Sequence, residues 1–354
     1  MVFICGPRQV GKTTLSKVFL QKNSEAYLNW DIPIHREKIL KRELPDSPIW
    51  IFDEIHKYEN WRNYLKGIYD QFGDTKQILV TGSAKLDVYR RGGDSLQGRY
   101  HFLRLFPLSV AELGISKQAD FLELLKLGGF PEPFFSSSEV EAKRWSIEYR
   151  TRMLEEDVVS LERINNLGTL ELLLINLPNY VGSPLSLNSL REELQVAHKT
   201  VAHWLEVFER LYAIFRLSPF ASKELRAVKK EQKHYHFDWT LIDDESLRFE
   251  NMVAVHLLKW CYFENDTKGR ELSLKYFRDI DKREVDFVIV EKTKPILFIE
   301  CKWNDGDISK ALRYINKKFP EAEHYQISAV GTKDYISGEG IRVCPACKFL
   351  ETLV

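Results

Sequence analysis

The residues best suited to chemistry open the chain, where glycines flank a lysine and a threonine at the spacing of a phosphate-binding loop. The glycines allow successive backbone N–H groups to curl around a polyphosphate, Lys12 reaches its β and γ oxygens, and the Thr13 hydroxyl ligates Mg²⁺. A glycine turn without a ligand is the alternative interpretation. The expected phosphate contacts are Gly6, Pro7, Arg8, Gln9, Val10, Gly11, Lys12, Thr13 and Thr14.

A second candidate is the acidic pair Asp53-Glu54, which follows the continuous apolar run 49–52. Such a run predicts a strand buried on both faces. At its carboxyl end, beside a phosphate loop, Asp53 would hold Mg²⁺ and Glu54 would orient an attacking water. An ordinary acidic pair at a strand end is the alternative. Ser83 follows the next predicted strand, and we interpret it as a sensor of the γ-phosphate or as an ordinary turn serine. Arg99 precedes the last strand of this region, and we interpret it as an arginine finger or as an exposed side chain.

The third set lies near the C-terminus, in two strand-like runs at 284–290 and 296–302. A hairpin symmetric about Thr293 places Asp286 opposite Glu300, and the two-residue period of a strand puts Lys302 on the same face. Two carboxylates and a lysine suit Mg²⁺ binding and phosphodiester hydrolysis. Glu250, near the start of a predicted helix, would complete the metal shell. A salt-bridged scaffold without turnover is the alternative.

The elements that position the first two sets alternate between strand and helix up to residue 105, which predicts a parallel sheet covered on both faces. Residues 107–180 predict helices, with a break and N-cap at 136–138 before a helix from Glu139 to about Leu161. The predicted strands are Val2–Cys5, Ala26–Asn29, Ile49–Phe52, Gln77–Thr81 and Tyr100–Leu105.

From residue 184 two short amphipathic helices, Leu187–Leu194 and Lys199–Arg210, precede an apolar run, which is helix-turn-helix spacing followed by a strand. The second helix would present polar residues to DNA, although a protein contact or a purely structural role is the alternative. The basic stretch 223–236 predicts a solvated loop or a phosphate-contacting wing. The presented residues are His198, Lys199, Thr200 and His203.

Composition restricts the functional class. The 354 residues predict two or three domains, and 51 basic against 51 acidic residues argue against binding DNA through a global field, though not through a local patch. No apolar run reaches membrane-spanning length and no signal peptide is recognised, so a cytoplasmic location is expected. Five cysteines form no disulfide framework, and the lone pair Cys344 and Cys347 is interpreted as incidental thiols rather than a metal or redox site.

The strings GPRQVGKTT, IFDEIHK, ILVTGSA, LQGRYHFLRLFPLSVAEL and GGFPEP resemble the AAA+ ATPases of bacteria and archaea that carry a C-terminal domain of unknown function. The resemblance implies an α/β AAA+ core with sheet order 5-1-4-3-2, ATP and Mg²⁺ as cofactors, and the roles given above for Lys12, Thr13, Asp53, Glu54 and Ser83, with Arg99 as the arginine. Relatives usually have a further N-terminal segment near the base, so the contacts of the adenine stay open.

The set Glu250, Asp286, Glu300 and Lys302, with the strings REVDF and ECK, resembles the PD-(D/E)xK restriction-endonuclease-like superfamily. The predicted domains are an ATPase core (1–108), a helical lid and linker (109–180), a winged-helix-like domain (181–237) and a nuclease-like α/β domain (238–354). Two functions follow. One is an ATPase that couples its nucleotide state to cleavage of DNA or RNA, with possible self-association, and the other is an ATP-dependent regulatory switch whose C-terminal domain only binds.

Overall fold

A computed structural model describes residues 1–20, 24–82, 96, 98–159, 166–220 and 232–353. The chain divides into two compact units. The first consists of Met1–Phe106 and Arg210–Tyr212, and the second of Pro107–Glu209 and Ala213–Val354. The residues predicted as lid, winged-helix and nuclease-like domains belong to the second unit, except Arg210–Tyr212 of the predicted winged-helix domain, which belong to the first.

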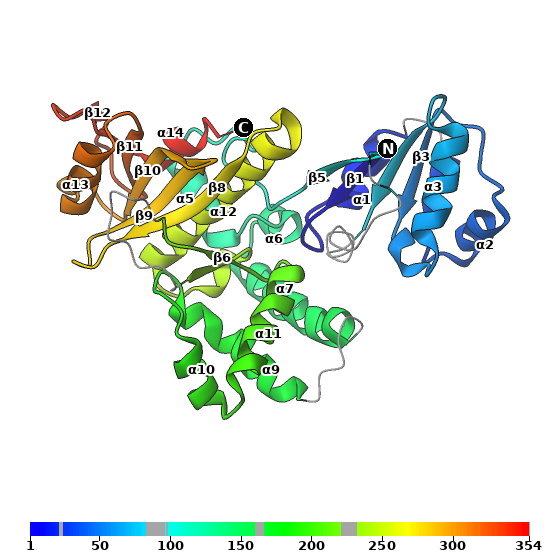
Figure 1. Cartoon of the computed structure of the whole chain (residues 1–354), viewed down its shortest axis with the longest axis horizontal. Coiled ribbons are helices and arrows are strands. Elements are labelled where there is room, and N and C mark those ends of the chain that lie inside the picture. The colour runs from blue at the N-terminus through cyan, green and yellow to red at the C-terminus, as the bar shows by residue number, and fades with distance from the viewer. Residues whose placement is uncertain (21–23, 83–95, 97, 160–165, 221–231, 354) are drawn as a thin grey trace. The chain divides into compact units, whose positions relative to one another are not determined.

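The first unit is built on a parallel five-stranded sheet in the order β2-β3-β4-β1-β5, which is 5-1-4-3-2 read from the other edge (Figure 1). Its central strands are apolar because helices cover both faces, and Ile51 and Phe52 are fully buried. The strands are β1 (Val2–Cys5), β2 (Tyr27–Asn29), β3 (Ile49–Asp53), β4 (Gln77–Thr81) and β5 (His101–Arg104). The helices are α1 (Lys12–Val18), α2 (Pro33–Lys41) and α3 (Trp61–Phe72), with short 3-10 turns at Ser24–Ala26 and Ile55–Lys57.

The register of this sheet brings three strand ends to one level. Asp53 pairs with Asn29 on one side and with Thr81 on the other. Since parallel strands present their carboxyl ends at the same edge, these three side chains can converge there. All five predicted strands are present, with ends that differ by one residue at most.

Some helices of the second unit begin at a polar side-chain cap, whereas α5 (Gln118–Leu127) and α6 (Pro131–Ser136) begin without one. The Ser138 side chain accepts a hydrogen bond from Glu141 N, which confirms the predicted N-cap before the long helix. That helix ends in a π-helical turn, Met153–Val158, and residues 160–165 lie outside the described residues. The helices are α5 (Gln118–Leu127), α6 (Pro131–Ser136), α7 (Glu139–Arg152) and α9 (Leu167–Asn176), followed by a 3-10 turn at Leu177–Tyr180.

Two further helices, α10 (Leu187–Leu194) and α11 (His198–Arg210), lie where the helix-turn-helix was predicted and pack near α9 (Figure 1). They are followed by β6 (Ile214–Leu217), which pairs antiparallel with β7 (Lys233–His236). The prediction of a solvated loop or wing was wrong for 233–236, because all four residues of β7 are buried. The rest of that basic stretch, up to residue 231, lies outside the described residues.

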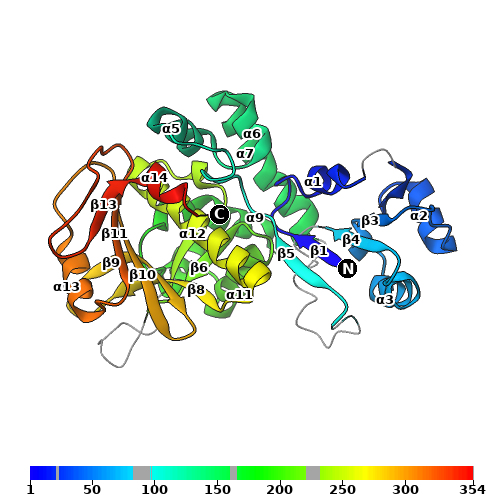
Figure 2. The same cartoon turned by 90° about the horizontal axis from the view of Figure 1, so that it is seen from above.

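A six-stranded mixed sheet in the order β12-β13-β11-β10-β9-β8 forms the C-terminal part of the second unit. The long helix α12 (Glu245–Lys268) lies along this sheet in both views (Figures 1 and 2). The strands are β8 (Leu272–Arg278), β9 (Glu284–Glu291), β10 (Lys294–Lys302), β11 (Glu323–Ser328), β12 (Tyr335–Ile336) and β13 (Arg342–Pro345). A 3-10 turn at Trp239–Leu241 precedes α12, and α13 (Lys310–Lys318) and α14 (Ala346–Leu350) complete the unit.

The predicted hairpin is present as β9 and β10. Its pairs Leu297↔Ile289, Phe298↔Val288 and Ile299↔Phe287 are symmetric about Thr293, while a bulge after Pro295 shifts the pairs nearest the turn. The next pair in this register would be Asp286 and Glu300, and there the ladder stops. Among the described helices, none is long and apolar enough to cross a membrane.

Candidate functional sites

The phosphate loop turns sharply between β1 and α1. Gly6 and Gly11 have φ angles of 139° and 95°, and Gln9 also has a positive φ of 60°. Gly6 cannot be replaced without moving the backbone, since a Cβ there would lie 2.0 Å from Leu105 O. Alternating backbone handedness of this kind points successive N–H groups toward one side, which is the geometry of an anion-binding nest.

Lys12 lies at the start of α1 and is buried. Its Nζ donates to Gly6 O at 3.0 Å and to Pro7 O, so the lysine closes back over the loop. Burial lowers the pKa of Lys12 to about 8, although the carboxylates of Glu54 and Asp53 act in the opposite direction. A bound polyphosphate would favour the charged form of the Lys12 amine, because its negative charge would lie close to the ammonium group.

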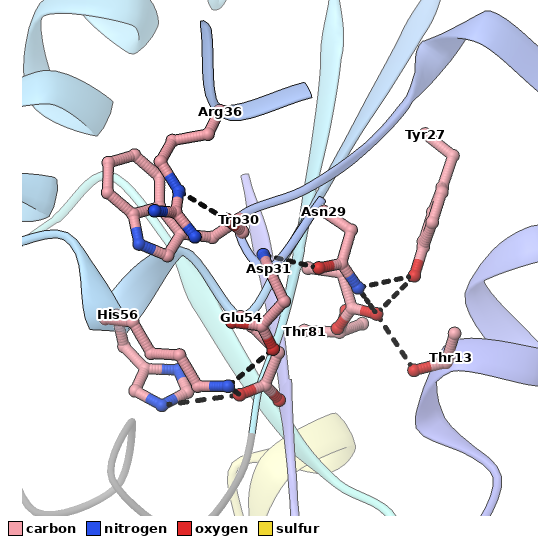
Figure 3. A network of polar contacts seen from close by, with 11 residues as sticks. Thr13, Tyr27, Asn29, Trp30, Asp31, Arg36, Glu54, His56 and Thr81 are labelled. Atoms are coloured by element: carbon pink, nitrogen blue, oxygen red, sulfur yellow. Dashed lines mark hydrogen bonds and ion pairs between the residues drawn. The ribbon is translucent and has the colours of Figure 1, made fainter. Parts of the chain in front are cut away.

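Asp53 accepts the hydrogen bonds of a polar network at the strand ends. Figure 3 shows its donors Thr13, Tyr27, Asn29 and Thr81. Its Oδ2 accepts hydrogen bonds from Tyr27 Oη at 2.6 Å, Thr13 Oγ1 at 3.0 Å and Asn29 Nδ2 at 3.3 Å. Its Oδ1 accepts from Thr81 Oγ1 at 2.6 Å. Asp53 is 4% exposed, and these four donors are all uncharged. The site therefore stabilises a buried carboxylate while leaving its negative charge without a paired cation among them.

This donor set fits Mg²⁺. The ion prefers carboxylate and hydroxyl oxygens, and the structure places one of each, from Asp53 and Thr13, within hydrogen-bond distance of each other beside the phosphate loop. When bound, Mg²⁺ would be held by these two side chains and would compensate phosphate charge.

Glu54 follows Asp53 in a left-handed backbone conformation with φ 56°. Its carboxylate lies 3.2 Å from Lys57 Nζ and 3.7 Å from His56 Nε2 (Figure 3). Lys57 also contacts Asp31 at 2.5 Å. Burial raises the pKa of Glu54, and Lys57 partly offsets that rise. A non-glycine residue held at positive φ beside a phosphate loop is the kind of strained position found at functional sites.

Two further predicted residues of the nucleotide site have different outcomes. Ser83 lies outside the described residues. Arg99 is described, and its Nε lies 2.8 Å from Asp70 Oδ1 of α3 in a partly exposed ion pair. An arginine finger role for Arg99 would require this pair to open.

In the C-terminal sheet, the backbone pairing of β9 and β10 ends before the predicted pair of Asp286 and Glu300. A hydrogen bond to the Asp286 side chain follows it. Asp286 Oδ2 accepts a hydrogen bond from Cys301 N at 2.8 Å. Lys302 Nζ donates to Glu300 Oε1 at 2.7 Å, so both predicted residues of β10 lie on one face. Glu300 Oε2 is buried and has no partner at hydrogen-bond geometry among the described residues, although the Ser309 side chain is close enough to lower the pKa of Glu300. An unpaired buried carboxylate oxygen is costly and is consistent with a missing cation.

Glu250 lies on α12 in the same electrostatic environment. Its Oε1 accepts from Tyr235 Oη at 2.7 Å and lies 3.5 Å from Lys233 Nζ. Burial and the Asp286 carboxylate raise the pKa of Glu250 to about 7. The same two causes raise the pKa of Glu300 to about 7. We call the whole group the acid–lysine cluster: Lys233, Glu250, Glu284, Asp286, Glu300 and Lys302.

The structure thus brings the four predicted C-terminal residues into one cluster, which also contains Lys233 and Glu284. Within the described ranges, no three His, Cys, Asp or Glu side chains form a group able to hold a metal ion. The cluster fits a salt-bridged arrangement directly and a metal only at the Asp286 and Glu300 end. Cys344 and Cys347 are buried free thiols.

Sequence reasoning missed the donors Tyr27, Asn29 and Thr81 around Asp53, and Lys233, Tyr235 and Glu284 in the acid–lysine cluster. Asn29 and Thr81 had a usable signal, because each is the last residue of a predicted strand next to β3.

The residues predicted to face DNA lie on the outer side of α11. His198 and Lys199 are exposed, whereas Thr200 and His203 are half-buried. The apolar residues of the same helix, including Trp204 and Phe208, are buried. A surface with two exposed basic side chains permits nucleic-acid contact but does not require it.

Comparison with known proteins gives three family matches. Residues 1–114 match a family model described as an AAA domain. Residues 118–244 and 247–349 match two models described as domains of unknown function, DUF8612 and DUF4143.

The relatives have no described function. Uncharacterized proteins of Mycobacterium tuberculosis and Haemophilus influenzae are 25% and 22% identical to this chain. The matches cover 88% and 84% of this chain, and 73% and 81% of the relatives.

A solved structure, the Aeropyrum pernix ORC1 protein in complex with DNA, aligns over 72% of this chain and 86% of that one, at 14% identity and a TM-score of 0.34. A score this low carries no argument about fold or ligand. Residues 1–114 are thus similar to an AAA domain, which supports ATP binding, and the rest of the matched chain is similar to two domains of unknown function.

Proposed function

We propose that the first unit binds and hydrolyses ATP with Mg²⁺, and that its nucleotide state regulates the second unit. The observation that carries this proposal is the buried carboxylate of Asp53, hydrogen-bonded to Thr13 of the phosphate loop. Lys12 would contact the phosphates, and Thr13 and Asp53 would hold the metal. Glu54, one residue beyond Asp53, would accept a proton from the attacking water.

The test of binding is Lys12→Ala, measured by calorimetry with ATP and Mg²⁺. Loss of a buried cation from the loop should abolish detectable binding. Lys41→Ala is the matched control, because Lys41 is an exposed lysine on α2. Unchanged ATP affinity in Lys12→Ala would contradict the proposal.

The test of hydrolysis is Glu54→Gln, which keeps the shape of the side chain and removes its basicity. ATP binding should persist while turnover falls by about 10²-fold or more. Wild-type turnover in this variant would remove Glu54 from the role of base.

A second activity is proposed for the acid–lysine cluster, namely metal-dependent cleavage of DNA or RNA. The buried Glu300 Oε2 favours it, because this oxygen lacks a partner within the described residues and lies on the strand face that carries Lys302. Mg²⁺ would be held by Asp286 and Glu300, and Lys302 would position or deprotonate water. The ion pairs of the cluster favour the alternative, a binding domain without turnover.

Cleavage separates these two functions. Single- and double-stranded DNA and RNA are incubated with the protein and Mg²⁺ or Mn²⁺, with Lys302→Ala as the variant and Lys294→Ala, an exposed lysine of the same strand, as the control. Metal-dependent cleavage lost only in Lys302→Ala supports a nuclease. No cleavage of any substrate supports the regulatory switch.

Location and assembly belong to the same proposal. We place the protein in the cytoplasm, where ATP and Mg²⁺ are abundant and free thiols persist. Self-association would allow Arg99 to reach a neighbouring nucleotide. The ATPase rate per protein molecule should then rise with protein concentration in the wild type and stay constant in Arg99→Ala.

A further inference from the structure

Lys233 is a lysine in the buried interior of the second unit, where a charged group is energetically unfavourable. It lies in β7 and is 1% exposed, with its backbone held between β6 and an isolated bridge to Pro184. Removing an ammonium from water costs several kcal/mol unless partners compensate. A lysine is therefore kept at this depth only if something requires its charge.

The partners of Lys233 are carboxylates from two other elements. Its Nζ lies 2.5 Å from Glu284 Oε1 at the start of β9, and 3.5 Å from Glu250 Oε1 on α12. The ring of Tyr276 lies beneath it, 5.4 Å from the ring centroid. Asp286 is close enough to act on the charge of Lys233 as well. This ammonium thus lies between acidic groups of one helix and one strand.

The remaining atoms around Glu250 leave little space for another ligand. Tyr235 Oη donates to the same oxygen, Oε1, that faces Lys233. A Cβ at Gly182 would lie 3.5 Å and 3.6 Å from the two carboxylate oxygens of Glu250 and would clash with Leu247 at 2.8 Å. A side chain at residue 182 would therefore be in van der Waals contact with this carboxylate and in conflict with Leu247.

We propose that Lys233 is the built-in cation of the acid–lysine cluster, occupying the position between Glu250 and Glu284 that a divalent metal ion would otherwise take. Glu250 is then a partner of Lys233 and Tyr235 and not a metal ligand. Lys233 is a positioning residue, because it forms ion pairs with Glu250 and Glu284 and acts on Asp286 through its charge.

This inference goes beyond the proposed function and stands whether or not the cluster cleaves nucleic acid. A metal ion at Asp286 and Glu300 would be held beside Lys302, whereas the Glu250 end would stay closed to metal as long as Lys233 is charged. It follows that removing the ammonium opens a new cation site formed by Glu250 and Glu284.

The test is Lys233→Met in the full chain, titrated with Mn²⁺ without nucleotide and followed by calorimetry and by electron paramagnetic resonance. The variant should bind one more Mn²⁺ than the wild type, at least tenfold more tightly than any wild-type binding at this cluster. Lys233→Arg retains a cation and should not gain the ion. Lys233→Met/Glu250→Gln should lose it again.

Two controls keep the result interpretable. Lys294→Met removes an exposed lysine from the same sheet and should bind Mn²⁺ as the wild type does. ATP binding by the first unit should be unchanged in Lys233→Met, which separates this test from failure of the proposed ATPase.

Equal Mn²⁺ binding by folded wild type and Lys233→Met overturns the proposal. If Lys233→Met does not fold alone, it is refolded with Mn²⁺ and in its absence. Recovery of folded protein only with Mn²⁺ supports a site that needs a cation, and no recovery in either condition overturns it.

Discussion

Asp53 in the first unit and the acid–lysine cluster in the second are both buried carboxylate sites, but different groups surround them. Four uncharged donors hold Asp53, from Thr13, Tyr27, Asn29 and Thr81. Lysines hold the cluster, with Lys233 at one end and Lys302 at the other. Hydroxyl and amide donors stabilise a carboxylate without cancelling its charge, whereas an ammonium cancels it.

The difference indicates what each site can accept. Asp53 accepts hydrogen bonds from uncharged donors beside the phosphate loop and suits an exchangeable cation that arrives with nucleotide. The cluster already contains its cations, so a metal ion can bind only where an oxygen is left unpaired, at Glu300. One site is therefore prepared for a ligand, whereas in the other two lysines of the chain offset part of the charge of four carboxylates.

The largest expected effect comes from removing the internal cation of the cluster. Lys233→Met removes the ammonium beside Glu250 and leaves Glu284 with Arg278 at 3.6 Å, and breaking a buried ion pair from one side costs about 3–5 kcal/mol of unfolding free energy. Urea unfolding in the absence of divalent ions measures the loss. Adding Glu284→Gln should recover part of it, and strictly additive losses would show that the two side chains do not interact.

A smaller loss is expected at the first site, because each donor there is one of four. Thr81→Val removes the 2.6 Å hydrogen bond to Asp53 Oδ1 and should cost about 1–3 kcal/mol. Thr75→Val is the control, because Thr75 is exposed and bonds only to the Phe72 carbonyl. Equal effects of the two substitutions in urea unfolding would mean that the buried carboxylate does not depend on this hydroxyl.

The two sites were also unequally visible in the sequence. The phosphate loop and Asp53-Glu54 are local patterns, in which fixed spacing and a buried strand determine the geometry. The hairpin was predictable because its symmetry about Thr293 sets the register beyond the bulge. These features need only contacts between neighbours in the chain or within one hairpin.

Lys233 was not predictable by the same reasoning. It is the last lysine of the basic stretch 223–236, and a run of lysines normally indicates solvent exposure. Its burial depends on β7 pairing with β6, and its partners Glu250 and Glu284 lie 17 and 51 residues away in sequence. Tyr27 was missed because its hydroxyl reaches Asp53 from the next strand, at a position two residues before the strand end. Such side-chain contacts between distant elements follow from the tertiary structure and not from periodicity.

The pH dependence of stability sharpens the contrast at the Glu300 end. Burial and Asp286 raise the pKa of Glu300 from 4.5 to about 7, against the effects of Lys302 and Ser309. The folded state then binds a proton more tightly than the unfolded state, so this group destabilises the fold progressively from about pH 4.5 to pH 7. Glu300→Gln should flatten that decline by on the order of 1 kcal/mol, as measured by urea midpoints at pH 5, 6 and 7. Glu351→Gln, at an exposed position, should follow the wild type. A wild-type slope in Glu300→Gln would assign the decline to other groups.

The smallest expected effect concerns Lys57, a lysine that contacts an acidic residue of the nucleotide site. Lys57 lies 3.2 Å from Glu54 and lowers its pKa against the opposing effect of burial. In Lys57→Met the pKa of Glu54 should rise further, so the base is deprotonated only at higher pH. The acid limb of the ATPase pH profile should move to higher pH by less than about one unit, because Lys57 is partly exposed and its charge is screened. Lys76→Met, which breaks an ion pair with Asp46, is the control and should leave the profile unchanged. An acid limb at the wild-type position in Lys57→Met would show that the pKa of Glu54 does not determine the acid limb. The first site would then resemble a site that binds nucleotide without using Glu54 as a base.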